Sequence, residues 1–115
     1  MTTREVVDHH LEAVRANDIE DTLADYAEDA VIVAAGTTIT GRPAIREAML
    51  GAFEAFFKPG TYVWTIESHV VAGTYSVVTW SLEFPGGTIP WGMDAFHVVD
   101  ERIVFQTGGF YLAAS

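Results

Sequence analysis

An acidic residue inside an apolar stretch is the first candidate for chemistry in this chain. Asp94 lies within residues 91–99, which otherwise have the composition of a strand. A carboxylate on an apolar sheet face is costly unless it is paired, hydrated or protonated. If the sheet curves around a pocket, burial raises the pKa of such a carboxyl toward neutrality. We therefore predict a general acid/base at Asp94; the alternative is an aspartate that pairs with an arginine or lies at a sheet rim.

Two residues of the first half of the chain could assist this carboxyl. His10 falls in the apolar stripe of a predicted helix, where it could donate to a developing oxyanion or exchange a proton with Asp94. Tyr26 lies on the apolar face of the next predicted helix, and its hydroxyl needs a partner. Asp94, His10 and Tyr26 are the predicted catalytic residues. The alternatives are a core histidine bonded to a backbone carbonyl and a tyrosine that only packs.

Large apolar side chains are numerous enough to line a hydrophobic cup around these groups. Those predicted to contact a ligand are Met49, Phe53, Phe56, Trp64, Trp80, Trp91 and Phe110. Each of them could instead pack in the core, as such side chains usually do.

Other kinds of site find little support in the sequence. His97 has the opposite strand parity from Asp94, so the two should not share a sheet face. His9 and His10 are adjacent on a helix and therefore point in two directions. Neither a glycine-rich phosphate loop nor a G-x-S-x-G elbow occurs. We predict no metal site and no cofactor.

Composition limits the classes of partner. The chain has 115 residues, enough for one domain over residues 1–115, and a net charge of −10. That charge repels nucleic acids and anionic membranes, so neither is an expected partner. No cysteine is present, which excludes disulfides, thiolate metal sites and a cysteine nucleophile. Without a signal pattern or a long apolar run, a cytoplasmic location is the default expectation.

Periodicity divides the chain into a helical half and a strand half. Helices are predicted over about residues 3–16 and 19–27, and a third begins at Gly41-Arg42-Pro43 and ends at Lys58-Pro59-Gly60. A short strand is predicted over residues 31–35, with a turn over 36–38. Four strands are predicted over residues 61–72, 75–84, 91–99 and 102–112, joined by short turns into an antiparallel meander. Helices first and strands later indicate an α+β fold.

Several segments resemble the NTF2-like superfamily, which includes SnoaL-like and ketosteroid-isomerase-like proteins. The segments are Asp18-Ile19-Glu20-Asp21, Tyr26-Ala27-Glu28-Asp29-Ala30-Val31, Gly41-Arg42-Pro43-Ala44-Ile45-Arg46, and Asp94-Ala95-Phe96-His97-Val98-Val99-Asp100 followed by Arg102-Ile103. The resemblance implies a curved, mostly antiparallel sheet wrapped around three helices, also described as a cystatin-like α+β cone. This fold hosts isomerases, cyclases, hydrolases and non-enzymes, so it does not by itself imply an activity.

The resemblance also separates two enzyme types. Steroid isomerase relatives carry a general-base aspartate at the position that Ala34 matches, so that activity is disfavoured. His10 matches their oxyanion tyrosine, and Tyr26 a tyrosine of their supporting network. SnoaL-like cyclases use an acid/base aspartate at the position that Asp94 matches. In this chain Val104-Phe105-Gln106 replaces the E-H-W that often follows in those relatives.

The sequence leaves two functions open. The first is a SnoaL-like enzyme of the isomerase, cyclase or hydrolase type, which performs acid/base chemistry on a small, mostly apolar, carbonyl-bearing substrate. The second is a non-catalytic cup that binds an apolar ligand, or an interaction module of the same fold. Apolar residues on the outer sheet face also predict a homodimer that forms through the sheet.

Overall fold

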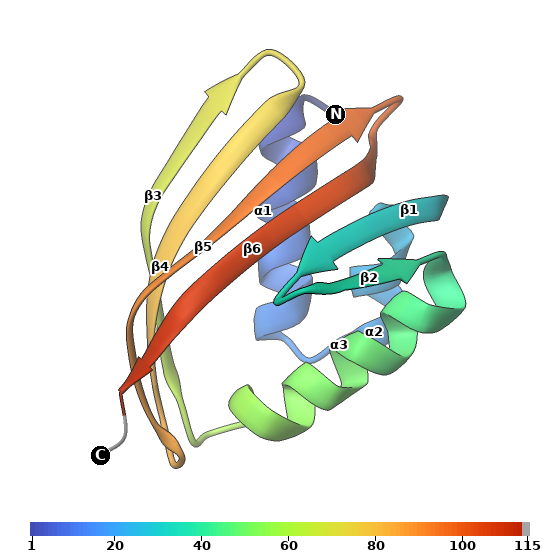
Figure 1. Ribbon diagram of the computed structural model, residues 1–115. Coiled ribbons are helices and arrows are strands. Elements are labelled where there is room, and N and C mark those ends of the chain that lie inside the picture. Colours follow the sequence, from blue (N-terminus) through green and yellow to red (C-terminus); the bar gives the residue numbers. More distant parts are fainter. Residues whose placement is uncertain (114–115) are drawn as a thin grey trace.

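A computed structural model describes residues 1–113 as three helices and one six-stranded sheet (Figure 1). Helix α1 (Thr3–Arg15) begins with the predicted capping box. The hydroxyl of Thr2 accepts a hydrogen bond from the Glu5 backbone N–H, and the Glu5 carboxylate accepts one from the Thr2 N–H. The predicted apolar stripe of α1 is buried, and His10 lies within it.

The next segment differs from the prediction. Helix α2 (Ile19–Ala24) ends three residues earlier than expected, and strand β1 (Tyr26–Ala34) takes up the residues that follow. Tyr26 pairs with Ile103 of a later strand, and the Asp25 carbonyl accepts a hydrogen bond of 2.7 Å from the Ile103 N–H. Because this pairing with a distant strand satisfies the backbone, it overrides the helical pattern of the local sequence.

A hairpin replaces the predicted turn that follows β1. Strand β2 (Thr37–Thr40) pairs with β1 through a two-residue turn in which Ala35 and Gly36 both have positive φ angles, 52° and 77°. Helix α3 (Arg42–Phe56) then starts after Gly41, with a proline in its first turn as predicted.

The remaining strands form the predicted meander. They are β3 (Val63–Ala72), β4 (Tyr75–Phe84), β5 (Gly87–Val99) and β6 (Arg102–Ala113). The strand order is β2-β1-β6-β5-β4-β3, and every neighbouring pair is antiparallel except β1 and β6. Strand β5 begins four residues before the predicted start, because Gly87 and Thr88 already pair with β4. The sequence predicts a turn at Pro85-Gly86-Gly87, so the strand is expected to start only at Trp91.

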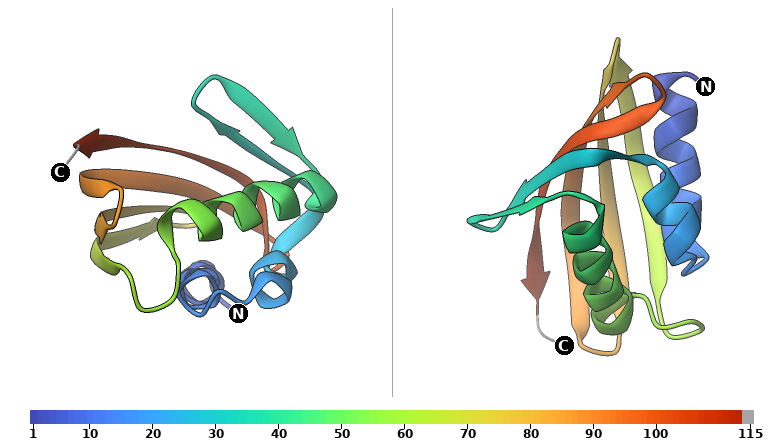
Figure 2. Two further views of the ribbon diagram at one scale, coloured as in Figure 1. Left: turned by 90° about the horizontal axis from the view of Figure 1, so that it is seen from below. Right: turned by 90° about the vertical axis from the view of Figure 1, so that its right-hand side faces the viewer.

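The helices cover one face of a curved sheet (Figure 2). Register shifts occur in the pairings of β3, β4, β5 and β6, and such irregularities bend a sheet. The core between the layers is apolar and includes the fully buried Val7, Ile45, Leu82 and Ile103. The α+β cone that the sequence predicted is confirmed. Within residues 1–113 no helix is both long enough and apolar enough to cross a membrane.

Candidate active site

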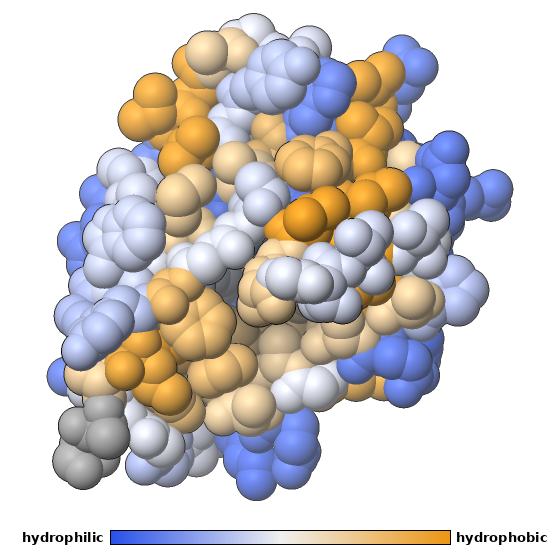
Figure 3. All heavy atoms as spheres, viewed as in Figure 1, coloured by the Kyte–Doolittle hydropathy of each residue, from blue (hydrophilic) through white to orange (hydrophobic). Residues whose placement is uncertain are grey.

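A cavity of about 440 Å³ opens between the concave sheet face, α1 and α3. This volume suits a small organic molecule. The mouth lies between the end of β6, the β1–β2 turn and α3, where Figure 3 shows the surface hollowed. The wall is almost entirely apolar. Its polar side chains are those of Asp94 and Gln106, together with the ring nitrogens of His10, Trp64 and Trp80.

Asp94 lies in this wall as predicted, held by two N–H donors. Trp80 Nε1 donates to its Oδ2 atom at 3.0 Å, and Gln106 Nε2 donates to its Oδ1 atom at 3.1 Å. Because β4, β5 and β6 are neighbours, all three side chains project from the same concave face. Neither of the two donors, the Trp80 indole and the Gln106 amide, carries a positive charge.

Two glycines make room for this arrangement. Gly108 pairs with Asp94 across β5 and β6, and a Cβ atom there would overlap Asp94 Oδ1. Gly92 pairs with Trp80 across β4 and β5, and a Cβ atom there would overlap the indole ring. The carboxylate and the indole therefore lie flat against backbone that carries no side chain.

The environment of Asp94 favours its neutral form. Burial raises the pKa of this carboxyl to about 6, and the hydrogen bonds from Gln106 and Trp80 oppose that rise only in part. At neutral pH the group is therefore mostly ionised, yet it can accept and return a proton within a small range of pH. This is the property required of a general acid/base.

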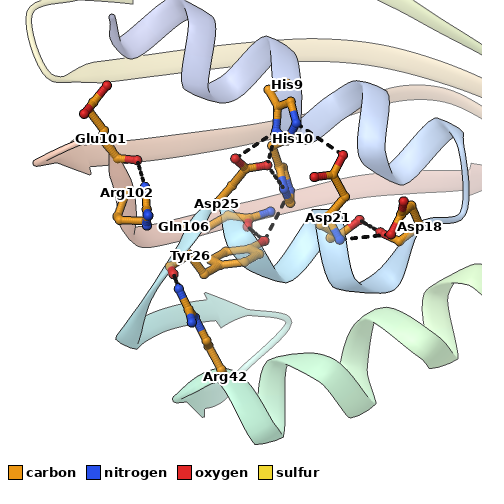
Figure 4. Close-up of polar contacts among 11 residues, drawn as sticks. His9, His10, Asp18, Asp21, Asp25, Tyr26, Arg42, Glu101, Arg102 and Gln106 are labelled. Atoms are coloured by element: carbon orange, nitrogen blue, oxygen red, sulfur yellow. Dashed lines mark hydrogen bonds and ion pairs between the residues drawn. The ribbon is translucent and has the colours of Figure 1, made fainter. Parts of the chain in front are cut away.

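Gln106, which donates to Asp94, is itself hydrogen-bonded to Tyr26, and Tyr26 lies close to His10 (Figure 4). The Tyr26 hydroxyl donates to Gln106 Oε1, and it also lies 3.3 Å from Nε2 of His10. The Tyr26 hydroxyl thus connects Gln106 Oε1 with Nε2 of His10. Tyr26 lies behind the cavity wall rather than in it, whereas the ring of His10 forms part of the wall.

His10 is neutral in this position. Burial lowers the pKa of its imidazole to about 4. Two smaller effects act on the same pKa: a backbone hydrogen bond with Thr22 raises it, and the nearby His9 lowers it. Its Nδ1 atom faces away from Tyr26, 4.0 Å from an Asp25 oxygen. The ring also makes edge-to-face contacts with Tyr26 and Phe96. An uncharged imidazole in this wall can act as a hydrogen-bond donor or acceptor but carries no charge.

A second polar cluster lies behind His10, toward the surface (Figure 4). His9 Nδ1 lies 2.8 Å and 2.9 Å from the two carboxylate oxygens of Asp25, and His9 Nε2 lies 3.2 Å from Asp21. The hydrogen bond with Asp25 raises the pKa of His9, whereas burial raises the pKa of Asp25. As predicted, His9 and His10 point in different directions. Residues 1–113 contain no group of three or more side chains placed to bind a metal ion.

Five of the seven predicted ligand-contacting side chains line the cavity: Met49, Phe56, Trp64, Trp80 and Phe110. Trp91 and Phe53 do not line it. Trp91 pairs with Tyr111 on the outer sheet face and is 52% exposed, since adjacent strand residues alternate and Gly92 takes the inner face. Phe53 shares the face of α3 that carries Met49 and Phe56, but it is buried in the core and is not part of the cavity wall.

Sequence reasoning missed the role of Gln106 and of the two glycines. A glutamine in a strand has no pattern that separates a solvent-facing position from a cavity position. The glycines did carry a signal, because glycine inside a strand often marks a close approach by another group. Ala34, which stands at the matched base position of the steroid isomerases, does line the cavity, next to Gly108 on β6. No carboxylate is present there.

Solved structures with the same architecture carry several descriptions. An NTF2-like protein of unknown function from Burkholderia xenovorans is 19% identical, with a TM-score of 0.78 over 98% of this chain and 85% of its own. A protein from Kribbella flavida, provisionally described as a ketosteroid isomerase, is 20% identical, with a TM-score of 0.80 over 98% and 80% of the two chains. A provisional polyketide cyclase from Sinorhizobium meliloti is 24% identical, with a TM-score of 0.78 over 91% and 94%.

These structural similarities establish the NTF2-like fold. At such low sequence identity they establish no activity. No curated protein sequence gives a significant match. The family model of the SnoaL-like domain, however, matches residues 7–106, which include Asp94, Gln106 and most of the cavity lining. The chain therefore belongs to the SnoaL-like domain family.

Proposed function

We propose that this protein is an enzyme that transfers protons on a small, mostly apolar, carbonyl-bearing substrate, with Asp94 as the acid/base. The observation that carries the proposal is a single carboxylate inside an apolar cavity, fixed by Trp80 and Gln106. Its raised pKa supports the same role. A carboxylate in such surroundings is a stronger base than one in water, and its geometry is set before the substrate arrives.

The proposed reaction starts with removal of a proton from the carbon next to the carbonyl. The C–H electron pair moves to form an enolate, and Asp94 becomes the neutral acid. Asp94 then returns the proton to a carbon of the same molecule. In a cyclisation the enolate carbon instead adds to a second carbonyl carbon of the substrate, the π electron pair of that C=O bond moves to its oxygen, and Asp94 gives its proton to this oxygen. No external reductant or oxidant is needed in either case, because the substrate is neither oxidised nor reduced overall.

The enolate oxygen needs a hydrogen-bond donor. Trp64 is the candidate for this role, because its Nε1 atom is buried beside the cavity without a partner in the described part of the chain. His10 is a second donor from the wall, although its Nε2 atom is already close to the Tyr26 hydroxyl. Tyr26 acts on Asp94 only through Gln106, so we assign it a positioning role. The steroid isomerase reaction is not proposed, since Ala34 replaces the base that it requires.

Hydrogen–deuterium exchange can test this proposal without knowledge of the natural substrate. A panel of small apolar ketones would be incubated with the protein in D₂O, and exchange of the protons next to the carbonyl followed by NMR. We expect faster exchange for at least one ketone, and a loss of about 100-fold or more in Asp94→Asn. Glu28→Gln is the matched control, since it removes one exposed carboxylate that is not part of the wall. Equal rates in the wild type and Asp94→Asn would refute the role of Asp94.

A non-catalytic binding protein is the second candidate. It is favoured by one observation: the side-chain polar atoms of Tyr26 and Gln106 bond to each other and to His10 and Asp94, so that few groups are free to act on a ligand. On this alternative, ketones would shift the NMR signals of wall residues, but no ketone of the panel would exchange its protons faster than in buffer.

A further inference from the structure

The cavity contains a carboxylate without a counter-ion. The chain has six lysines and arginines, all within residues 1–113, and none lines the cavity. Each is engaged elsewhere: Arg4 with the His69 carbonyl, Arg15 with the Trp64 carbonyl, Arg42 with the Tyr26 carbonyl, Arg46 with Glu20, Lys58 with Glu54, and Arg102 with the Glu101 carbonyl. His10, the histidine in the wall, is neutral. The negative charge of Asp94 therefore has no cationic partner among residues 1–113.

The carboxylate retains free acceptor capacity. Oδ1 and Oδ2 each accept one N–H, from Gln106 and Trp80 respectively. A carboxylate offers about four lone-pair positions in all, so each oxygen can accept one further hydrogen bond from a ligand. A donor that also carries positive charge would form a stronger bond here than a neutral donor.

Four aromatic rings line the same cavity as this carboxylate. The ring centroids of Trp80 and Phe110 lie 6.2 Å apart, those of Trp64 and Trp80 6.3 Å, and those of Phe56 and Phe110 5.7 Å. All four rings line the cavity. Aromatic faces attract organic cations, and walls of this kind recognise alkylated ammonium groups.

We propose that the cavity binds hydrophobic ammonium ions, with Asp94 as the counter-ion and the aromatic rings around the alkyl or aryl body. The ligand class is an organic amine small enough for a cavity of about 440 Å³. This goes beyond the proposed proton transfer: the two share Asp94, but ammonium binding needs no turnover. The net charge of −10 also raises the local concentration of cations over that of anions.

The same features discriminate against carboxylates and phosphates. An anionic ligand would bring a second negative charge next to Asp94 in apolar surroundings, with no cation in the wall to offset it. Neutral alcohols and ketones lie between the two classes. They can use the apolar wall, but they lack the charge that would pair with the carboxylate.

A series of ligands with one body and three head groups tests the proposal. 2-Phenylethylamine, 2-phenylethanol and phenylacetate would be titrated into the protein at pH 8 by calorimetry, and by NMR of the side-chain N–H signals of Trp80 and Gln106. We expect the amine to bind at least about tenfold more tightly than the alcohol, and phenylacetate more weakly than either. The two N–H signals should shift on addition of the amine, because both groups bond to Asp94.

Two variants connect the preference to the cavity. In Asp94→Asn the amine and the alcohol should bind with affinities within about twofold of each other, whereas Glu28→Gln, with the same change in net charge, should keep the tenfold preference. Equal affinities in the wild-type protein would overturn the proposal, and this comparison needs no variant. A preference that survives in Asp94→Asn, or that Glu28→Gln abolishes equally, would overturn it too. Amine binding without any ketone exchange would leave this inference standing while refuting the proposed enzyme activity.

Discussion

Among single residues, the ionisation of Asp94 decides the chemistry proposed for the cavity. Asp94 lies among apolar groups, and its two hydrogen-bond partners are neutral N–H donors rather than cations. Such surroundings keep the carboxyl reactive at a cost in stability, because the charged form is less well solvated in the folded state than in the unfolded state. Functional sites commonly retain side chains that weaken the fold.

Removing this charge should stabilise the protein at neutral and higher pH. The folded pKa of Asp94 is about 6 against an ordinary value of 3.8, so its cost to stability grows as the pH rises from about 4 to 6 and is constant above. We expect Asp94→Asn to raise the free energy of unfolding by about 1–3 kcal/mol at pH 8, and by nearly nothing at pH 3.5.

Urea unfolding of both proteins at the two pH values would measure this difference. The pKa of His10 is lowered, so its contribution to stability is lost as the pH falls from about 6.5 to 4; it titrates in both proteins and cancels in the comparison. Destabilisation by Asp94→Asn at pH 8 would show that the carboxylate is instead held by favourable interactions.

At the scale of elements, the strands place the site because their residues alternate between the two faces. Asp94, Trp80 and Gln106 come from three neighbouring strands and meet on the concave face. The sequence predicted the strand of Asp94 and its parity relative to His97, and the structure confirms both: His97 stacks on Tyr75, outside the wall. A two-residue period alone was enough for this part of the site.

Other parts of the site could not be derived from local sequence. The start of β1 depends on its parallel pairing with β6, which is distant in the chain. Gln106 became part of the site only through the register of β6 against β5. Trp91 stands three residues before Asp94, so strand alternation directs its side chain to the opposite face, and its aromatic character does not indicate which face it takes.

One hairpin offers a stability test at this scale. Asp100 and Glu101 form the two-residue turn between β5 and β6, and both have positive φ angles, 51° and 61°. This conformation is unfavourable for side chains other than glycine, and to a lesser extent asparagine and aspartate. We expect Glu101→Gly to raise the free energy of unfolding by about 1 kcal/mol, measured by urea denaturation.

Glu101→Ala is the control for this substitution. Both variants lose the exposed ion pair between Glu101 and the amino terminus, but only glycine relieves the backbone conformation. If alanine stabilised the protein as much as glycine, the effect would come from the lost carboxylate and not from the turn.

At the scale of the whole molecule, the two faces of the sheet differ in how they are covered. The helices cover the concave face (Figure 2), whereas the outer face carries exposed apolar side chains (Figure 3). These are Val33, Val63, Val70, Tyr75, Val77, Trp91, Phe105 and Tyr111. A single-chain protein rarely exposes so many apolar groups on one face, which supports the prediction of a homodimer that forms through the sheet.

Light scattering coupled to size exclusion would test this prediction. We expect the wild type to have about twice its chain mass of 12.6 kDa and Val77→Lys to be a monomer, because Val77 lies on the outer face of β4 opposite Val70. Leu50→Lys, at an exposed apolar position on α3, should leave the dimer unchanged. A monomeric wild-type protein would contradict the prediction.

The most direct test of the central claim is a ¹³C NMR titration of the Asp94 carboxyl carbon in the free protein, assigned by its absence in Asp94→Asn. We predict a pKa of about 6 for this carboxyl, well above the ordinary value of 3.8, because it lies in an apolar cavity whose wall contains no lysine or arginine. Ketone exchange should rise with pH through the same midpoint, since the ionised form is the base. A measured pKa near 4 would mean that Asp94 is well solvated or paired, and it would contradict both the proposed chemistry and its physical basis.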